Sequence, residues 1–220
     1  MRLLLIRHGQ TPANVRGELG TAHPGPGLTE LGTRQAAMIP AALRNEPIDG
    51  IFASTLIRTQ LTAEPLATDR RLDIQVMGGL HEIEAGSLEG RTERASVHSY
   101  LETVFAWGLG DLDKAMPGGP DGHSFFARFD SDIDTIASQA ETAVVFSHGA
   151  AIRVWTAARA LNVPPRFAGV NELDNTGVVE LVGSPADGWM LASWAGVPVG
   201  GAELVDESAV DPTGETLDLS

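Results

Sequence analysis

Two short apolar runs in this chain end in the same way, and this repetition constrains the fold more than any other feature. Leu3 to Ile6 leads into Arg7-His8-Gly9, and Ala143 to Phe146 leads into Ser147-His148-Gly149. Buried runs of this length are typical of parallel strands, whose carboxyl ends meet at one edge of a sheet where ligands bind. The sequence therefore predicts an α/β fold that brings His8 and His148 to the same edge.

Strand-like and helix-like stretches alternate along most of the chain, as they do in layered α/β proteins. Strands are expected near residues 2–7, 50–53, 74–77, 142–147, 176–182 and 189–194, and helices near 29–43, 55–67 and 149–161, with two more between 92 and 139. We therefore expect an α/β/α arrangement around a mostly parallel, mixed sheet. The expected domain covers 1–198, with a cap insertion at about 92–139 and an acidic C-terminal tail at 199–220.

Composition narrows the class of protein. With 220 residues and 43% hydrophobic content, the chain can bury a large core as one domain. A net charge of -14 argues against nucleic-acid binding, which needs a basic surface. The absence of cysteine excludes disulfides and thiol catalysis, and the first apolar run is too short for a membrane span or a secretory signal. We expect a cytoplasmic protein with no membrane partner, and the oligomeric state is not predicted.

The ratio of arginine to lysine indicates the base composition of the genome that encodes the chain. Fourteen arginines stand against one lysine, which is typical of a GC-rich bacterial genome. This bias carries no information about chemistry.

Arg7 and His8 suit the capture of a phosphoryl group. A guanidinium offers a planar fork of donors to phosphate oxygens, and a neutral imidazole is a nitrogen nucleophile. Arg58 lies at the start of a predicted helix, directly after a strand end, with Ser54 as the expected N-cap. Arg58 therefore either joins Arg7 in an anion site or is an ordinary solvated helix residue.

A Glu-rich turn follows the strand expected near 74–77. Glu82, Glu84 and Glu89 all belong to this turn. One of them would serve as a proton donor if a partly buried site kept it neutral, whereas a solvated acidic loop needs none of them. The spacing alone does not choose among the three.

Metal and nucleotide sites find no support in the sequence. The stretch His81 to Ala85 lacks the second histidine of the helical zinc-protease pair, and no cysteine is present as a soft ligand. The Gly-containing stretch Met116 to Pro120 is not followed by the Gly-Lys-Ser/Thr ending of a phosphate-binding loop. We therefore expect neither a dedicated metal nor a cofactor.

These separated motifs resemble those of the histidine phosphatase superfamily, which contains the cofactor-dependent phosphoglycerate mutases. The resemblance covers about the first 180 residues and also includes Leu28 to Gly32 and Asn175 to Gly177. It implies a phosphoglycerate mutase-like fold and a small phosphorylated substrate. The residues that it implies for the site are His8 as phosphorylated nucleophile, Glu82 as general acid and base, and Arg7, Asn14, Arg58 and His148 around the phosphoryl oxygens.

Phosphatases and mutases of this superfamily share the first half of the reaction. The resemblance places a tyrosine and a lysine of the mutases, which hold the substrate carboxylate, at Ala85 and Glu93 of this chain. We therefore expect a metal-independent phosphomonoester hydrolase that works through a phosphohistidine. The alternatives are a cofactor-dependent phosphoglycerate mutase and, from a different class, a non-catalytic phospho-ligand or protein-binding module. In the hydrolytic mechanism His148 is expected to be protonated and Glu82 to begin neutral.

Three further expectations concern the regions around the site. The segment Gly108 to Gly122 is predicted to form a loop over the site, because it is rich in glycine and proline. The aromatic residues near it are expected in the core: Phe105, Trp107, Phe125 and Phe126. After Gly201 the chain carries only acidic charges, which predicts a mobile, solvated tail rather than a gating segment. These charges are Glu203, Asp206, Glu207, Asp211, Glu215 and Asp218.

Overall fold

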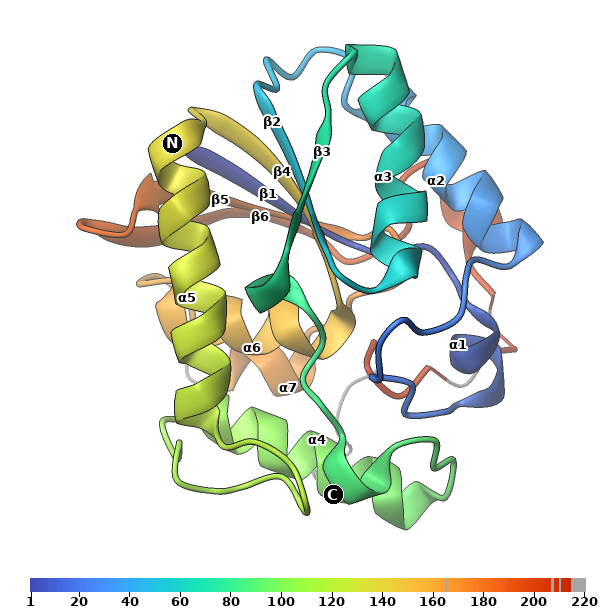
Figure 1. The fold of residues 1–220 in the computed structure, drawn as a ribbon, viewed down its shortest axis with the longest axis vertical. Coiled ribbons are helices and arrows are strands. Elements are labelled where there is room, and N and C mark those ends of the chain that lie inside the picture. Colours follow the sequence, from blue (N-terminus) through green and yellow to red (C-terminus); the bar gives the residue numbers. More distant parts are fainter. Residues whose placement is uncertain (165, 207, 210, 215–220) are drawn as a thin grey trace.

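A six-stranded sheet forms the centre of the structure, in the order β3-β2-β4-β1-β5-β6 (Figure 1). The computed structural model describes residues 1–164, 166–206, 208–209 and 211–214. The strands are β1 (Arg2–Arg7), β2 (Gly50–Ser54), β3 (Ile74–Met77), β4 (Thr142–Ser147), β5 (Val178–Ser184) and β6 (Gly188–Ala195). The first four run parallel, whereas β5 is antiparallel to β1 and β6 to β5. The mixed, mostly parallel sheet predicted from the sequence is confirmed.

Strands β1 and β4 are neighbours in this sheet, and their register places the two histidines together. Arg7 pairs with Ser147 at the carboxyl end of the ladder, so His8 and His148 leave the sheet side by side. The backbone N–H of His8 still donates to the carbonyl of Ser147, at 3.0 Å. The two His-Gly motifs therefore share one edge of the sheet, as the apolar runs predict.

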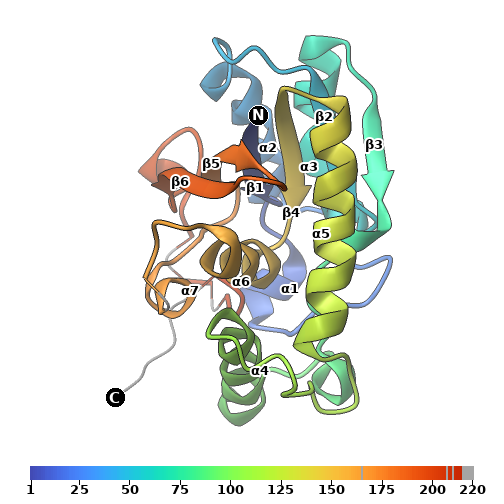
Figure 2. The ribbon, with the colours of Figure 1, turned by 90° about the vertical axis from the view of Figure 1, so that its left-hand side faces the viewer.

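Helices cover both faces of the sheet (Figure 2). They are α1 (Pro12–Arg16), α2 (Glu30–Ala42), α3 (Ile57–Arg70), α4 (Arg94–Gly108), α5 (Gly122–Gln139), α6 (Gly149–Arg159) and α7 (Phe167–Val170). Alternate residues of β1 enter different clusters, because successive strand side chains point to opposite faces. Leu4 joins the cluster formed with α2 and α3, and Leu5 joins the one formed with α4, α5 and α6. None of these helices in the described part of the chain is long and apolar enough to cross a membrane.

The aromatic residues near the α4–α5 connection lie in the core, as predicted. Phe105, Trp107, Phe125 and Phe126 are all at most 7% exposed. The connection itself, residues 109–121, contacts the short 3₁₀ turn Gly86–Leu88, where the N–H and hydroxyl of Ser87 both donate to the carbonyl of Pro117. The loop therefore lies beside the segment that carries Glu82.

Local expectations differ from the structure in two places. Ser54 is the last residue of β2, and α3 begins at Ile57 with Leu56 as its N-cap, so the prediction of Ser54 as the cap was wrong. The hydroxyl of Ser54 instead accepts from the N–H of Leu56 at 3.2 Å, within a turn that precedes the helix. The short helices α1 and α7 were not predicted, since four or five residues carry too little periodicity to be recognised.

Part of the acidic tail packs against the rest of the protein. Asp206 and Asp211 both bond to residues near β1, which differs from the solvated tail expected from the sequence. Glu203 is exposed. Glu207, Glu215 and Asp218 lie outside the described residues.

Candidate active site

His8 is held as a neutral imidazole at the end of β1. Its ring is 2% exposed, and Nδ1 lies 2.8 Å from the carbonyl oxygen of Gly9. Because a carbonyl only accepts hydrogen bonds, Nδ1 carries the proton and Nε2 keeps its lone pair. Burial, reinforced by the positive charges of Arg58 and Arg7, holds the pKa of His8 well below its usual 6.5. The imidazole is therefore unprotonated at neutral pH, as nucleophilic attack requires.

His148 faces His8 across the same edge. The two ring centroids are 5.2 Å apart, and His148 is fully buried. Burial lowers the pKa of His148 well below 6.5, and the positive charge of Arg58 adds to this effect. The ring is thus neutral in this structure, whereas the mechanism expected from the sequence takes it as protonated while it stabilises the phosphoryl oxygens.

Ser54 is the hydrogen-bond partner of His148. Its Oγ lies 2.7 Å from Nε2 of His148, while Nδ1 has no hydrogen-bond partner in the described part of the chain. Oγ of Ser54 also lies 3.1 Å from Oγ1 of Thr59, whose own hydroxyl donates to the carbonyl of Leu56, so the single Ser54 proton serves either Thr59 or Nε2 of His148. In the tautomer whose Nε2 accepts from Ser54, Nδ1 carries the hydrogen and is a buried donor without an acceptor among the described residues.

Arg58 supplies further buried donors in the first turn of α3. Its Nη2 donates to the carbonyl of Gly20 at 3.1 Å, whereas Nε and Nη1 find no acceptor within the described residues. The side chain is 3% exposed, and burial is the main reason that its pKa falls to about 10. Buried donors left without acceptors are costly, so these nitrogens indicate a site for an anion.

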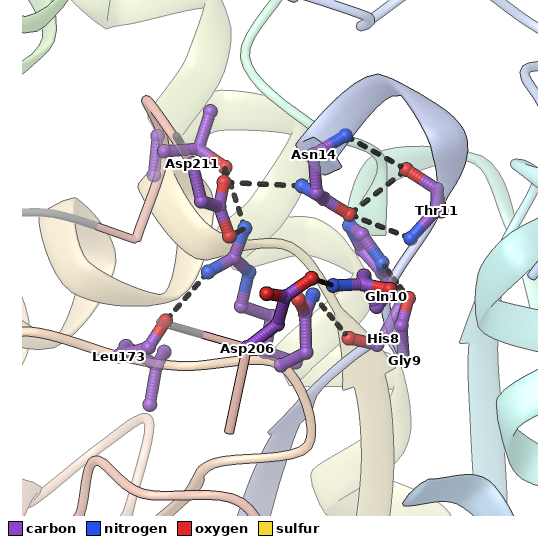
Figure 3. Close-up of polar contacts among 12 residues, drawn as sticks. His8, Gly9, Gln10, Thr11, Asn14, Leu173, Asp206 and Asp211 are labelled. Atoms are coloured by element: carbon purple, nitrogen blue, oxygen red, sulfur yellow. Dashed lines mark hydrogen bonds and ion pairs between the residues drawn. The ribbon is translucent and has the colours of Figure 1, made fainter. Parts of the chain in front are cut away.

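Arg7 and Asn14 converge on one carboxylate. Nη1 of Arg7 donates to the carbonyl of Leu173 at 2.7 Å, and Nη2 forms a 2.5 Å ion pair with Asp211. Asn14 donates from Nδ2 to the same carboxylate at 3.0 Å (Figure 3). Its Oδ1 accepts from the N–H of Thr11 in the capping box of α1, which orients the amide. These contacts involving Asp211 were not anticipated from the sequence.

Glu82 lines the same small cavity as His8 and lies at the N-terminus of α6. Its carboxylate accepts from the N–H groups of Ala151 and Ile83, each at 2.9 Å, and of Ala150 at 3.2 Å. Arg128 fixes the preceding backbone, because its guanidinium donates to the carbonyls of Gly79, His81 and Glu82. These bonds fix the position of the carboxylate at the cavity wall.

The other two carboxylates of the turn have different partners. Glu84 bonds to Nε2 of His81 at 2.9 Å, and this bond is the main cause that lowers the pKa of Glu84. Glu89 accepts from the N–H groups of Thr21 and Ala22. Of the three candidates left open by spacing, Glu82 is the one that lines the cavity with His8.

The cavity that these residues share measures about 10 Å³. It is lined by His8, Thr11, Ala13, Asn14, Glu18, Gly20, Arg58, Glu82 and Thr213. Apart from the two glutamates, the polar groups around His8 are guanidinium, imidazole, amide and hydroxyl donors, which suit an anion. Among the described residues, no group of three or more histidine, aspartate or glutamate side chains is arranged to hold a metal ion.

Comparison with known proteins identifies the family of the chain. The family model of the histidine phosphatase superfamily (branch 1) matches residues 3–196. The chain belongs to this superfamily. The family resemblance drawn from the separated motifs is thus confirmed, together with the fold that it implies.

Two curated proteins are similar to this chain in sequence. PE-PGRS family protein PE_PGRS11 of Mycobacterium tuberculosis is 40% identical over 94% of this chain, which spans 38% of that protein's length. Adenosylcobalamin/alpha-ribazole phosphatase of Salmonella typhimurium is 33% identical over 74% of this chain and 81% of its own length. Among solved structures, mycobacterial glucosyl-3-phosphoglycerate phosphatase in complex with VO3 superimposes with a TM-score of 0.73. It is 26% identical and covers 89% of this chain and 99% of its own.

Sequence reasoning missed several residues of this histidine phosphatase site. The sequence predicts Ser54 only as a helix cap, whereas the structure bonds it to His148. Asp211 and Thr213 lie in the tail that is predicted to be solvated, whereas both contact Arg7. Arg153 is also fully buried, between the carbonyls of Ala168 and Thr213. The sequence signal that could have indicated Arg153 is its position as an arginine inside the apolar helix that follows His148.

Proposed function

We propose that this protein hydrolyses a phosphate monoester of a small metabolite, with His8 as the nucleophile that carries the phosphoryl group. One observation carries the proposal: buried donors without acceptors surround a neutral imidazole. Among the described residues they are Nε of Arg7 and Nε and Nη1 of Arg58, joined by Nδ1 of His148 in the tautomer that carries its hydrogen there. A phosphoryl group supplies the acceptors and the negative charge that these donors lack.

The first half of the reaction forms the phosphoenzyme. Nε2 of His8 attacks phosphorus, a nitrogen–phosphorus bond forms, and the bond from phosphorus to the alcohol oxygen breaks. Arg58 and His148 stabilise the charge on the equatorial oxygens, and Arg7 and Asn14 bind the remaining oxygen once Asp211 has moved away. Glu82 gives its proton to the departing alcohol oxygen. No metal is needed, because the guanidinium groups supply the positive charge.

The second half releases phosphate. Water attacks phosphorus, the nitrogen–phosphorus bond breaks, and the electron pair returns to Nε2 of His8. The ionised Glu82 takes the proton from the attacking water, which restores the starting state. Inorganic phosphate leaves as the second product.

Hydrolysis is favoured over transfer to a phosphoglycerate. Ala85 is fully buried and offers no side-chain donor, and the carboxylate of Glu93 would repel rather than hold a substrate carboxylate. Relatives such as adenosylcobalamin/alpha-ribazole phosphatase and glucosyl-3-phosphoglycerate phosphatase support the same choice, since both are phosphatases by name. We therefore propose that water is the acceptor.

The proposed substrate carries one phosphate group near the site. The segment 98–130 holds two fixed cations, Lys114 and Arg128. Lys114 is paired with Glu102 at 3.0 Å, and Arg128 is engaged with three backbone carbonyls. Neither is placed to bind further phosphates, which disfavours inositol polyphosphates. We also propose a cytoplasmic, bacterial enzyme, because cysteine is absent and the named relatives are bacterial.

The decisive experiment measures phosphate release from an aryl phosphate after exhaustive chelation of metal ions. We expect turnover to be unchanged by the chelator, since the charge on the transition state is balanced by arginines. A rate that disappears and returns with a divalent ion would contradict the proposed mechanism. Efficient, primer-dependent exchange between 3- and 2-phosphoglycerate would instead identify a mutase, and no turnover of any ester would favour a binding module.

The pH dependence of the reaction should reflect the lowered pKa of His8. Only the unprotonated ring attacks, so kcat/KM is expected to stay level down to about pH 6.5 and to fall only as the pH approaches the lower pKa of the buried ring. The profile must be corrected for the second ionisation of the phosphate ester, near pH 6. His98→Ala is a matched control, because that side chain is 56% exposed on α4. An acid limb centred at 6.5 or above would contradict a neutral, buried His8.

A further inference from the structure

The described part of the C-terminal tail lies against the cavity. We call residues 205–206, 208–209 and 211–214 the strap. Asp206 accepts from Nε2 of Gln10 at 2.9 Å, as Figure 3 shows, and the carbonyl of Gly214 accepts from the N–H of Leu173 at 3.1 Å. Leu204, just before the strap, is buried, and its carbonyl accepts from Gln35. The strap is therefore tied to the protein at both ends.

Asp211 occupies the donors that a phosphoryl group would use. Its carboxylate contacts Nη2 of Arg7 at 2.5 Å and Nδ2 of Asn14 at 3.0 Å, so two oxygens of one anion bridge the two side chains (Figure 3). Thr213 takes a further bond from the same Nη2 at 2.9 Å. With Nη1 on the carbonyl of Leu173, both terminal nitrogens of Arg7 are engaged.

The strap also limits the space beside His8. Thr213 forms part of the wall of the cavity, which measures about 10 Å³. A volume of roughly 10–15 Å³ admits a single water molecule, so a phosphoryl group does not fit while this wall is in place. The strap is therefore closed over the site in this structure.

The Asp211 carboxylate and a phosphate monoester repel each other, so they cannot both bind Arg7 at the same time. A phosphate monoester carries between one and two negative charges near neutral pH, and Asp211 would lie within a few ångströms of it at the same guanidinium. Like charges at that separation repel strongly in a site with little water. The buried Arg7 therefore pairs with Asp211 or with the substrate.

Arg153 gives the strap an anchor that is independent of Arg7. Its Nη1 donates to the carbonyl of Thr213 at 3.0 Å, and its Nε and Nη2 donate to the carbonyl of Ala168. This contact uses the backbone of the strap and not its charge. The ion pair of Asp211 is thus the part of the strap whose loss relieves competition at Arg7 without removing every contact of the strap.

We propose that the strap is an intramolecular competitor of the substrate, in which the carboxylate of Asp211 binds Arg7 and Asn14 in place of phosphoryl oxygens. This inference rests on the proposed function, because it requires a phosphoryl group at Arg7. Substrate binds only to molecules whose strap has left Arg7, so the apparent affinity is the intrinsic affinity reduced by the open fraction. The strap thereby regulates how readily the site accepts any phosphate ester.

The test compares three variants of the full chain. Asp211→Asn keeps the shape of the side chain and removes its charge. Gly214→Ala places a Cβ against Nη1 of Arg7, which displaces the strap by steric conflict instead of by charge. Glu203→Gln is the matched control, since it removes one negative charge from an exposed position just before the strap.

Binding of inorganic phosphate, measured by calorimetry, gives the first readout. We expect Asp211→Asn and Gly214→Ala to bind phosphate roughly tenfold more tightly than the unaltered chain, and Glu203→Gln to bind it equally, because one charge-assisted contact no longer competes. The KM for an aryl phosphate should fall in parallel. Equal phosphate affinity in Asp211→Asn and Glu203→Gln would overturn the proposal.

Hydrogen exchange at the backbone N–H of Leu173 gives a readout that does not depend on activity. This N–H donates to Gly214 of the strap, whereas the next one, of Asp174, donates to the carbonyl of Gly196 and serves as an internal control. Phosphate should speed exchange at Leu173 in the unaltered chain, since the ligand expels the strap. Slower exchange with phosphate would show a lid that closes on substrate and would overturn competition.

The two proposals fail in different ways. If no variant binds phosphate or hydrolyses an ester, the proposed function is wrong, and competition at Arg7 is wrong with it. If all variants bind phosphate with the same affinity and hydrolyse the ester alike, the proposed function stands and the competing role of Asp211 alone is wrong.

Discussion

His8→Ala is expected to lower kcat by about a millionfold, the scale of loss seen when a covalent nucleophile is removed from an enzyme. Without the imidazole no nitrogen–phosphorus bond forms, and water would have to attack the ester directly. The residual donors of Arg58 and His148 still bind phosphate, so the loss should fall mainly on kcat and little on KM. Steady-state kinetics with an aryl phosphate measures both constants.

Labelling of the phosphoenzyme is a second measurement that tests the role of His8. During turnover of a labelled ester, label that is stable in base and labile in acid should appear on the unaltered chain and be absent from His8→Ala. His98→Ala, which removes an exposed histidine, should keep both label and rate. A fully active His8→Ala, or label retained on it, would assign the phosphoryl group to another residue.

The sheet could be predicted because its inner strands carry a strong local signal. Leu3 to Ile6 and Ala143 to Phe146 are continuous apolar runs, which is what a strand covered by helices on both faces requires. The order of the strands could not be read in the same way, since it depends on contacts between segments far apart in the chain. Likewise, the five-residue helix α1 is specified mainly by its capping box at Thr11 and Asn14, and not by periodicity.

The sequence could predict the position of a candidate residue where a strong element carries it. His8 and His148 follow neighbouring buried strands, so their proximity follows from the sheet alone. Ser54 was misread because capping rules consider only bonds within a few residues, whereas its most informative partner, His148, is 94 residues away. The lowered pKa of His148 could not be predicted from the sequence, because its burial and the nearby charge of Arg58 are tertiary effects.

The position of the strap also depends on contacts between residues far apart in the chain, which the sequence does not reveal. Asp211 and Asn14 are 197 residues apart, and the acidic tail has no periodic pattern that would predict where it docks. Its composition alone indicates a solvated segment, since isolated carboxylates have no reason to leave water. What changes the outcome is a buried Arg7 that lacks a counter-ion within its own strand, and this need appears only once the sheet has formed.

Glu82→Gln is expected to slow alkyl phosphates far more than activated aryl phosphates. The role proposed for Glu82 is to protonate the departing oxygen, which an alkoxide needs and a low-pKa phenolate hardly needs. General acid catalysis contributes on the order of a hundredfold to ten-thousandfold, and a loss of that size is expected for the alkyl ester. The measurement is kcat/KM across a series of esters whose leaving groups differ in pKa.

Glu84→Gln is the matched control for this prediction, because it makes the same chemical change two residues away, where the carboxylate bonds to His81 at the surface. Its effect should be small and independent of the leaving group. The glutamine at position 82 also loses an acceptor for the N–H groups of Ala150 and Ala151, which would disturb the site for every ester alike. The slope of rate against leaving-group pKa separates the two effects, since structural damage shifts the whole line and loss of a proton donor steepens it. A parallel shift in Glu82→Gln, or a steeper line in Glu84→Gln, would move the acid to another residue.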